Sequence, residues 1–225
     1  MLVDGRVAPI GGADGPAGRD LEGRILDAAL VCVARWGVAK TTLDDIAGEA
    51  GCSRATVYRV VAGGKDGLML AAAERELERF FAHLAVRLAA EATLADRLAV
   101  GIAEAIRVIR GHAALQYLNE HEPEVVLPFI SFDALDPLLA AAAGFGVVAL
   151  GPYLDEAEAR ETGEWVARIV LSYGFEPDDH LDLTDVATAN RFVRRYLPHL
   201  TRAGSPDPTP ATVRRTTKEL VHVHH

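Results

Sequence analysis

Residues 41–65 constrain the fold of this chain more than any other segment, because they contain two helix-start signals around one glycine. Thr42 is a good N-cap residue, and Asp45 stands where a carboxylate can return a bond to the cap. Gly51 is suited to the left-handed conformation that ends a helix. Ser53 follows and can cap a second helix. The segment therefore predicts two short helices joined by a tight turn.

The apolar residues of this segment fall on one side of each predicted helix. They are Leu43, Ile46, Ala47 and Ala50 in the first helix, and Val57 and Val60 in the second. The polar residues left mostly outward on the second helix are Arg54, Thr56, Tyr58 and Arg59. A small helix that is held by its apolar side and presents such side chains has the chemistry of a major-groove reader. The pattern predicts DNA binding, and the alternative is a helical hairpin whose polar side is merely solvated.

The rest of the chain predicts an all-α protein, because helical periodicity recurs and no segment shows sustained strand alternation. Half of the residues are hydrophobic but only 6% are aromatic, which favours helices packed through small side chains. Thr184 is expected to cap the last helix. The predicted helices span residues 20–36, 65–90, 93–111, 113–121, 133–150, 156–173 and 185–197, with a piece at 125–132 broken at Pro128.

Several motifs near the N-terminus are spaced as in a known family. They are Arg24–Ala29, Trp36-Gly37-Val38, Thr41–Ala50, Gly51–Arg59 and the following Lys65. Roughly residues 20–70 thereby resemble the N-terminal domain of TetR/AcrR-type transcriptional regulators. Val61 departs from the family pattern, which usually has an aromatic residue there, and the link Ala62-Gly63-Gly64 is one residue longer than its commonest form.

The resemblance implies a three-helix helix-turn-helix domain followed by a larger helical domain that binds a ligand and forms a homodimer. We place a flexible arm at residues 1–18, the DNA-binding domain at 19–66, the ligand-binding and dimerisation domain at 67–202, and a flexible tail at 203–225. The tail is expected because prolines interleave with Thr, Ser and Gly after Arg202.

Family position also implies roles for individual side chains at the DNA. Thr41 or Thr42 would donate to a phosphate at a helix start, where backbone N–H groups converge. Arg54 and Thr56 are candidates for contacts with base edges, since arginine can form two hydrogen bonds with guanine and threonine can contact the methyl group of thymine. The remaining candidates are Ala55, small enough for close approach, Tyr58 and Lys65 for phosphates, and Arg59 for either task.

A second group of residues is apolar and lies in the predicted C-terminal domain. Lining a pocket and filling an ordinary core are both open interpretations of these residues, which are Tyr117, Leu118, Phe129, Phe132, Leu135, Tyr153 and Trp165. Few charges fall on their faces, which favours a lipophilic or acyl-bearing effector. By resemblance and apolar stripes, we expect the dimer interface on the helices around Ile169 and Phe192.

Metal and cofactor chemistry is not expected. Residues 119–122 and His112 include metal-ligand types, but adjacent helical residues point in different directions and no ligand spacing occurs. A solvated helix end is the better interpretation. The chain also has no Gly-rich phosphate loop after a strand, no nucleophile elbow and no convincing acid–base pair, so we expect no enzyme. Cys32 and Cys52 are interpreted as small core residues.

Charge and hydropathy restrict the remaining function classes. The net charge of −9 argues against a protein that coats nucleic acid nonspecifically, but not against one small DNA-binding surface on an otherwise acidic protein. The uncharged stretch 137–154 is interrupted by glycines and a proline, so we predict a buried helix, no membrane association and a cytoplasmic protein. The prediction is a homodimeric repressor released by a small molecule. The alternatives are a small-molecule-binding helical protein with a vestigial helix-turn-helix and a constitutive architectural DNA binder.

Overall fold

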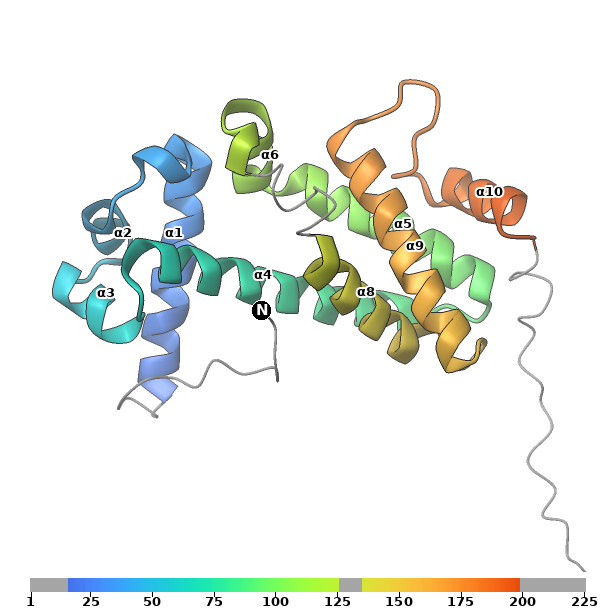
Figure 1. Cartoon of the computed structure of the whole chain (residues 1–225), viewed down its shortest axis with the longest axis horizontal. Coiled ribbons are helices and arrows are strands. Elements are labelled where there is room, and N and C mark those ends of the chain that lie inside the picture. The colour runs from blue at the N-terminus through green and yellow to red at the C-terminus, as the bar shows by residue number, and fades with distance from the viewer. Residues whose placement is uncertain (1–15, 126–134, 199–225) are drawn as a thin grey trace, which may run out of the picture.

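A computed structural model describes residues 16–125 and 135–198 and shows helices throughout these two ranges (Figure 1). The helices are α1 (Pro16–Lys40), α2 (Leu43–Ala50), α3 (Arg54–Val60), α4 (Gly64–Ala89), α5 (Leu94–Gly111), α6 (Ala113–His121), α8 (Leu135–Leu150), α9 (Glu156–Phe175) and α10 (Val186–Tyr196). The predicted all-α class is therefore confirmed. The predicted arm ends inside α1, which begins at Pro16. Residues 1–15, the piece at 126–134 and the tail at 199–225 lie outside the described residues.

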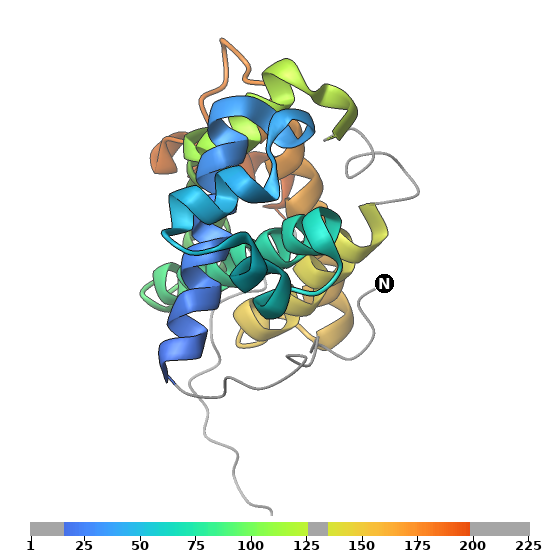
Figure 2. The same cartoon turned by 90° about the vertical axis from the view of Figure 1, so that its left-hand side faces the viewer.

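Helices α1–α3 form a head at one end of the molecule, and α5, α6 and α8–α10 form a body, of which α6 lies nearest the head and packs on α1 (Figures 1 and 2). The head has its own buried core, in which Ile25, Ile46 and Val57 are almost fully inaccessible to solvent. The core of the body surrounds α5, whose Leu94, Ile102 and Ile106 are fully buried. Burial of this apolar surface is the main force that holds each group of helices together.

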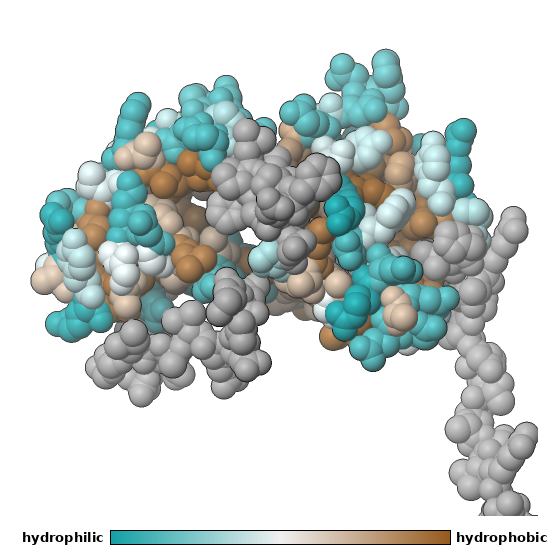
Figure 3. Space-filling model, viewed as in Figure 1, coloured by the Kyte–Doolittle hydropathy of each residue, from teal (hydrophilic) through white to brown (hydrophobic). Residues whose placement is uncertain are grey.

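Helix α4 joins the two groups. Its Leu68 and Ala72 are buried in the head core, and Leu84 is buried in the body core. Leu70 of the same helix, in contrast, is 57% exposed. On the face shown in Figure 3, hydrophilic residues predominate at the outer edges, and apolar residues reach the surface nearer the middle.

Helices α8 and α9 cross with backbone against backbone. A Cβ atom added to Gly146 would lie 2.5 Å from the carbonyl oxygen of Ala159 and 3.0 Å from the Cα of Gly163. A Cβ added to Gly163 would lie 2.6 Å from the carbonyl oxygen of Ala142. Only glycine permits so close an approach. None of the described helices is both long and apolar enough to span a membrane.

One predicted helix end agrees with the structure, and one predicted cap does not. The first part of α1 ends at Trp36, as predicted, because Gly37 has a non-helical φ of 80° and kinks α1 before its last residues, 38–40. Trp36 itself is 40% exposed. The last helix is capped by Asp185, whose side chain accepts a bond from the Thr188 N–H. Thr184 instead donates to Asp182 through its N–H and its hydroxyl, so its predicted capping role was wrong.

Candidate nucleic-acid interface

The start of α2 is fixed by a capping box. The Thr42 hydroxyl oxygen accepts the Asp45 N–H at 3.2 Å, and the Asp45 carboxylate accepts the Thr42 N–H at 2.9 Å. The same carboxylate also accepts the Thr42 hydroxyl at 2.6 Å. These side-chain and backbone bonds to Thr42 lower the pKa of Asp45 and favour its charged form. The predicted cap is confirmed by this geometry.

The turn between α2 and α3 sets the direction of the second helix. Gly51 adopts the left-handed conformation at φ 67° and ψ 38°, and the Cys52 N–H bonds to the Ala47 carbonyl oxygen at 2.9 Å. The Ser53 hydroxyl oxygen accepts the Thr56 N–H at 3.1 Å and thereby caps α3. The head thus contains the two short helices that the sequence predicted.

One side of α3 is anchored and the opposite side is open to solvent. Val57 is 1% exposed in the head core and holds the helix down. The outward side chains are Arg54, Ala55, Tyr58 and Arg59, with Thr56 half-buried beside the Ser53 hydroxyl. A small helix with these exposed side chains has the chemistry used in major-groove recognition.

Arg54 is not free on this face. Its guanidinium Nη1 lies 2.8 Å from a carboxylate oxygen of Asp44 on α2, and Nη2 donates to the Tyr58 hydroxyl at 3.3 Å. The guanidinium carbon also lies 5.6 Å from the centre of the Tyr58 ring. The bond to Tyr58, together with the charge of Asp44, raises the pKa of Arg54. Asp44 is not among the residues predicted for this site, because the sequence alone does not show that the start of α2 lies beside the start of α3.

Thr41 was a candidate for a phosphate contact, and the structure corrects this. Its side chain is 1% exposed, and its hydroxyl donates to the Gly37 carbonyl oxygen at 2.6 Å. The Thr41 N–H bonds to the same oxygen at 3.3 Å. Because both donors of Thr41 are used inside the head, Thr42, which is exposed, is the better placed of the two threonines. Lys65, at the start of α4, donates to the Ala39 carbonyl oxygen at 3.3 Å.

Glu122 was expected in a solvated helix end, and this interpretation was wrong. Its residue exposure is 8%, and its carboxylate accepts the Val38 N–H at 2.8 Å and the Ala39 N–H at 3.3 Å. Glu122 therefore ties the end of α6 to the last residues of α1, which follow the Gly37 kink and precede α2. Glu122 follows other polar residues and does not differ from them in sequence. Nothing in the sequence indicates that its carboxylate bonds to backbone N–H groups more than eighty residues away.

The proposed pocket residues are not gathered into one place among the described residues. Leu118 is buried against Val33 of α1, between head and body. Tyr117 stacks on His121, with ring centres 4.4 Å apart. Tyr153 and Trp165 pack against the body core. Phe129 and Phe132 lie outside the described residues, as does the side chain of Leu135.

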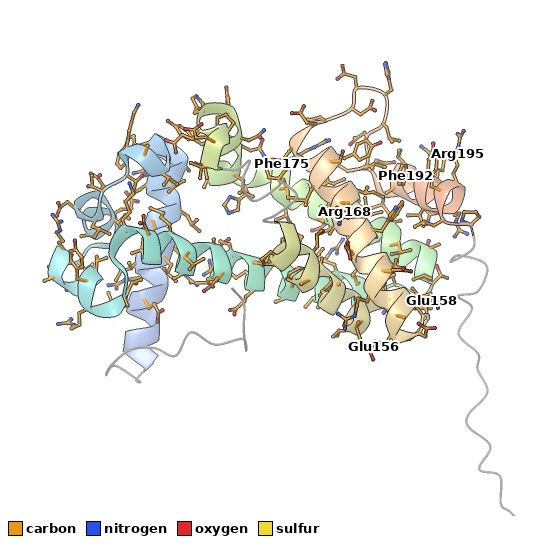
Figure 4. The ribbon with its side chains drawn as sticks, viewed as in Figure 1. Glu156, Glu158, Arg168, Phe175, Phe192 and Arg195 are labelled. Atoms are coloured by element: carbon orange, nitrogen blue, oxygen red, sulfur yellow. The ribbon has the colours of Figure 1, made fainter. Side chains whose placement is uncertain are left out.

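The two residues expected at a dimer interface are partly buried within their own chain. Ile169 packs against the body core, and the ring centre of Phe192 lies 6.3 Å from that of Tyr173 (Figure 4). Cys32 is buried in the head core, where burial raises the pKa of its thiol, and Cys52 packs at the edge of the same core. The expectation that the cysteines are small core residues agrees with these positions.

Comparison with known proteins supports the assignment of the head. Residues 25–72 match the family described as "Bacterial regulatory proteins, tetR family". An uncharacterized HTH-type transcriptional regulator of Mycobacterium tuberculosis is 31% identical over 150 residues, which cover 66% of this chain and 72% of the relative.

Solved structures show the same fold over most of the chain. The TetR family repressor AlkX from Dietzia sp. strain DQ12-45-1b, implicated in biodegradation of n-alkanes, has a TM-score of 0.62 and 23% identity over 86% of this chain and 99% of its own. The regulator FadR from Bacillus subtilis, solved in complex with stearoyl-CoA, has a TM-score of 0.51 and 20% identity over 80% of this chain and 98% of its own. The capped helix pair, the matched family and the relative agree: the chain belongs to the tetR family of bacterial regulatory proteins and is a DNA-binding transcriptional regulator.

Proposed function

We propose that this regulator binds its operator as a homodimer through the outward face of α3 and is released by a lipophilic effector bound in the body. The observation that carries the proposal is the α3 face, where exposed polar and cationic side chains are presented by a helix whose other side is anchored. Arg54 and Thr56 read bases, Ala55 permits close approach, and Thr42, Tyr58 and Lys65 contact phosphates. Arg59 serves either task.

Replacing Arg54 by alanine is expected to reduce both affinity and sequence preference. A bidentate arginine–guanine contact contributes about 1–3 kcal/mol of discrimination. Lys65→Ala is expected to weaken binding to all sequences alike. It should also make the dependence of log affinity on log salt concentration less steep, by about one unit per half-site. Fluorescence anisotropy measures both effects on a labelled fragment from upstream of the protein's own gene and on a scrambled fragment.

Arg195→Ala is the control for these variants, because Arg195 is an exposed arginine on α10, far from the head (Figure 4). It should bind both fragments like the parent. If Arg54→Ala and Lys65→Ala also bind like the parent, the α3 face is not the reading surface.

The proposed homodimer uses the outer side of α8 together with α9. Helix α8 carries no charged residue after Asp136, yet its Val148 is 78% exposed. An exposed side without charge is typical of an interface, and α9 lies directly against α8. Ile169 is kept in the proposed interface because α9, unlike α10, lies against α8, and Ile169 is only partly buried. The apolar side of α10 packs on α5 and α9, so Phe192 is not included.

We expect Val148→Glu to convert the dimer into a folded monomer, because the new carboxylate would be desolvated in the interface. Sedimentation velocity at micromolar concentration measures the change, and circular dichroism checks the fold. The matched control is Val86→Glu on α4, since Val86 is 75% exposed and lies outside the proposed interface. A parent that sediments as a monomer would contradict the dimeric mechanism.

The effector is proposed to be a molecule with a long hydrocarbon chain. The apolar character of the candidate pocket residues supports this, and the names of the two solved relatives mention n-alkanes and stearoyl-CoA. A ligand acts only through its preference for the state that does not bind DNA, and a thousandfold preference corresponds to about 4 kcal/mol.

Stearoyl-coenzyme A is therefore expected to displace the parent from operator DNA, whereas coenzyme A alone should not. A charged residue at Phe129, Phe132 or Leu135 should blunt this release and leave operator affinity intact. The measurement is operator occupancy against ligand concentration. Equal release by coenzyme A alone would exclude recognition of the hydrocarbon chain, and identical curves for all three variants would place the pocket elsewhere.

A further inference from the structure

The α1–α2 turn, by which we mean residues 37–41 from the Gly37 kink near the end of α1 to the residue before the α2 cap, has backbone polar groups bonded from three directions. Gly37 breaks α1, and its carbonyl oxygen accepts both donors of Thr41. The Ala39 carbonyl oxygen accepts the Lys65 ammonium at 3.3 Å. The N–H groups of Val38 and Ala39 point to the carboxylate of Glu122. Because Thr42 follows directly and caps α2, the position of this turn fixes where α2 begins.

Glu122 is the partner of this turn that comes from the body. Bonds from backbone N–H groups to a carboxylate are stronger than neutral ones, and they are strengthened further where water is excluded. Breaking them would leave a nearly buried carboxylate and two N–H groups without these partners, which costs free energy. Gly37 makes room for the carboxylate, since a Cβ atom there would lie 2.1 Å from Glu122 Oε1.

An apolar cluster surrounds this contact and joins three parts of the molecule. Val33 of α1 packs on Ala114 and Leu118 of α6, and partly buried Met69 and Phe175 lie against them. Phe175 is the last residue of α9 and also contacts the body core (Figure 4). Apolar contacts of this kind are non-directional and allow sliding, whereas the Glu122 bonds fix one register of α6 against the head.

We propose that Glu122 is the positioning residue that couples the body to the reading head. A shift of the end of α6 pulls the carboxylate from the Val38 and Ala39 N–H groups, and the start of α2 and the Lys65 side chain then lose their fixed position. The consequence for operator affinity rests on the proposed function, but the mechanical coupling does not.

The two tryptophans allow the coupling to be tested without DNA. Trp36 lies in the head beside Gly37, and Trp165 lies on α9 in the body. In Trp165→Phe protein the fluorescence reports the head, and in Trp36→Phe protein it reports the body. Urea unfolding at one fixed protein concentration should give coincident curves for both reporters with Glu122 present, as a single cooperative transition requires.

Glu122→Gln should separate the curves, with the head midpoint falling by about 0.5–1 M urea while the body midpoint stays in place. A purely structural role would lower both midpoints together. Glu122→Asp keeps the charge but shortens the side chain, and it should move the head midpoint in the same direction by less. Glu124→Gln is the matched control, because Glu124 is exposed near the same helix end, and it should leave both curves unchanged.

Operator binding provides the second measurement. Glu122→Gln should reduce affinity for the upstream fragment roughly tenfold, within the usual range of coupling between sites, and Glu124→Gln should not. Coincident urea curves in Glu122→Gln protein, or equal falls in both midpoints, would overturn the proposal. If the parent itself does not bind the fragment, the proposed function fails, and the urea curves alone then decide whether Glu122 couples the two parts.

Discussion

Gly146→Ala is expected to lower the free energy of unfolding by about 2–3 kcal/mol, although it adds only one methyl group. The added Cβ would meet the Ala159 carbonyl oxygen at 2.5 Å, and backbone atoms cannot rotate away as a flexible side chain can. Helices α8 and α9 must therefore move apart, which loosens contacts along their whole crossing. Urea unfolding followed by circular dichroism measures the loss.

The control for Gly146→Ala is Gly48→Ala on α2, where an added Cβ atom would meet nothing outside its own helix within 4 Å. Alanine is favoured over glycine inside a helix by about 0.5–1 kcal/mol, so this variant should be slightly more stable than the parent. Equal stability of the two variants would mean that α8 and α9 are not in backbone contact.

Gly37→Ala is expected to lower the free energy of unfolding by at least as much, about 3 kcal/mol, because two costs combine. Its φ of 80° and ψ of 174° belong to a region that is essentially restricted to glycine and costs other residues about 1–3 kcal/mol. The new Cβ would also lie 2.1 Å from Glu122 Oε1 and expel the carboxylate. Urea unfolding with Trp36 as the reporter measures the effect on the head.

Gly51→Ala separates these two costs, since Gly51 also has a positive φ but has open space around its Cβ position. It should cost only about 1–2 kcal/mol, the usual penalty of the left-handed conformation. A double-mutant cycle provides a further test. Glu122→Ala should lower the free energy of unfolding less in Gly37→Ala protein than in the parent, because the carboxylate has already been displaced. Purely additive effects would show that the two positions do not interact.

The head was predictable from sequence because its signals are local. Thr42, Asp45, Gly51 and Ser53 each act on backbone groups within a few residues, so their spacing alone specifies the caps and the turn. The helical body was predictable for a similar reason, from its apolar periodicity. Periodicity does not predict burial residue by residue: Leu70 and Trp36 are large and apolar but exposed, because a periodic pattern does not show where a neighbouring helix ends.

Two of the residues that the sequence analysis missed or misjudged act on other elements, and a third depends on a local kink. Asp44 reaches Arg54 on another helix, and Glu122 reaches a turn in another part of the chain. Thr41 was misjudged because its hydroxyl is consumed by the Gly37 carbonyl oxygen, which depends on a kink that sequence alone suggested only as a helix end. Such contacts follow from how helices pack, and one sequence does not specify that packing in advance.

The pairing of Arg54 with Asp44 has a kinetic consequence for the search along DNA. In the free protein Arg54, the cation proposed to read bases, is already paired with a carboxylate, on a chain whose net charge is −9. Non-specific residence on DNA depends on unpaired positive charge, so the Asp44 pairing should reduce the contribution of Arg54 to binding of arbitrary sequence. A base edge that replaces both Asp44 and the Tyr58 hydroxyl as partners of the guanidinium would then slow dissociation. Asp44 would then compete with DNA for Arg54 and speed dissociation from wrong sites. Specificity would appear in the dissociation rate rather than in the association rate.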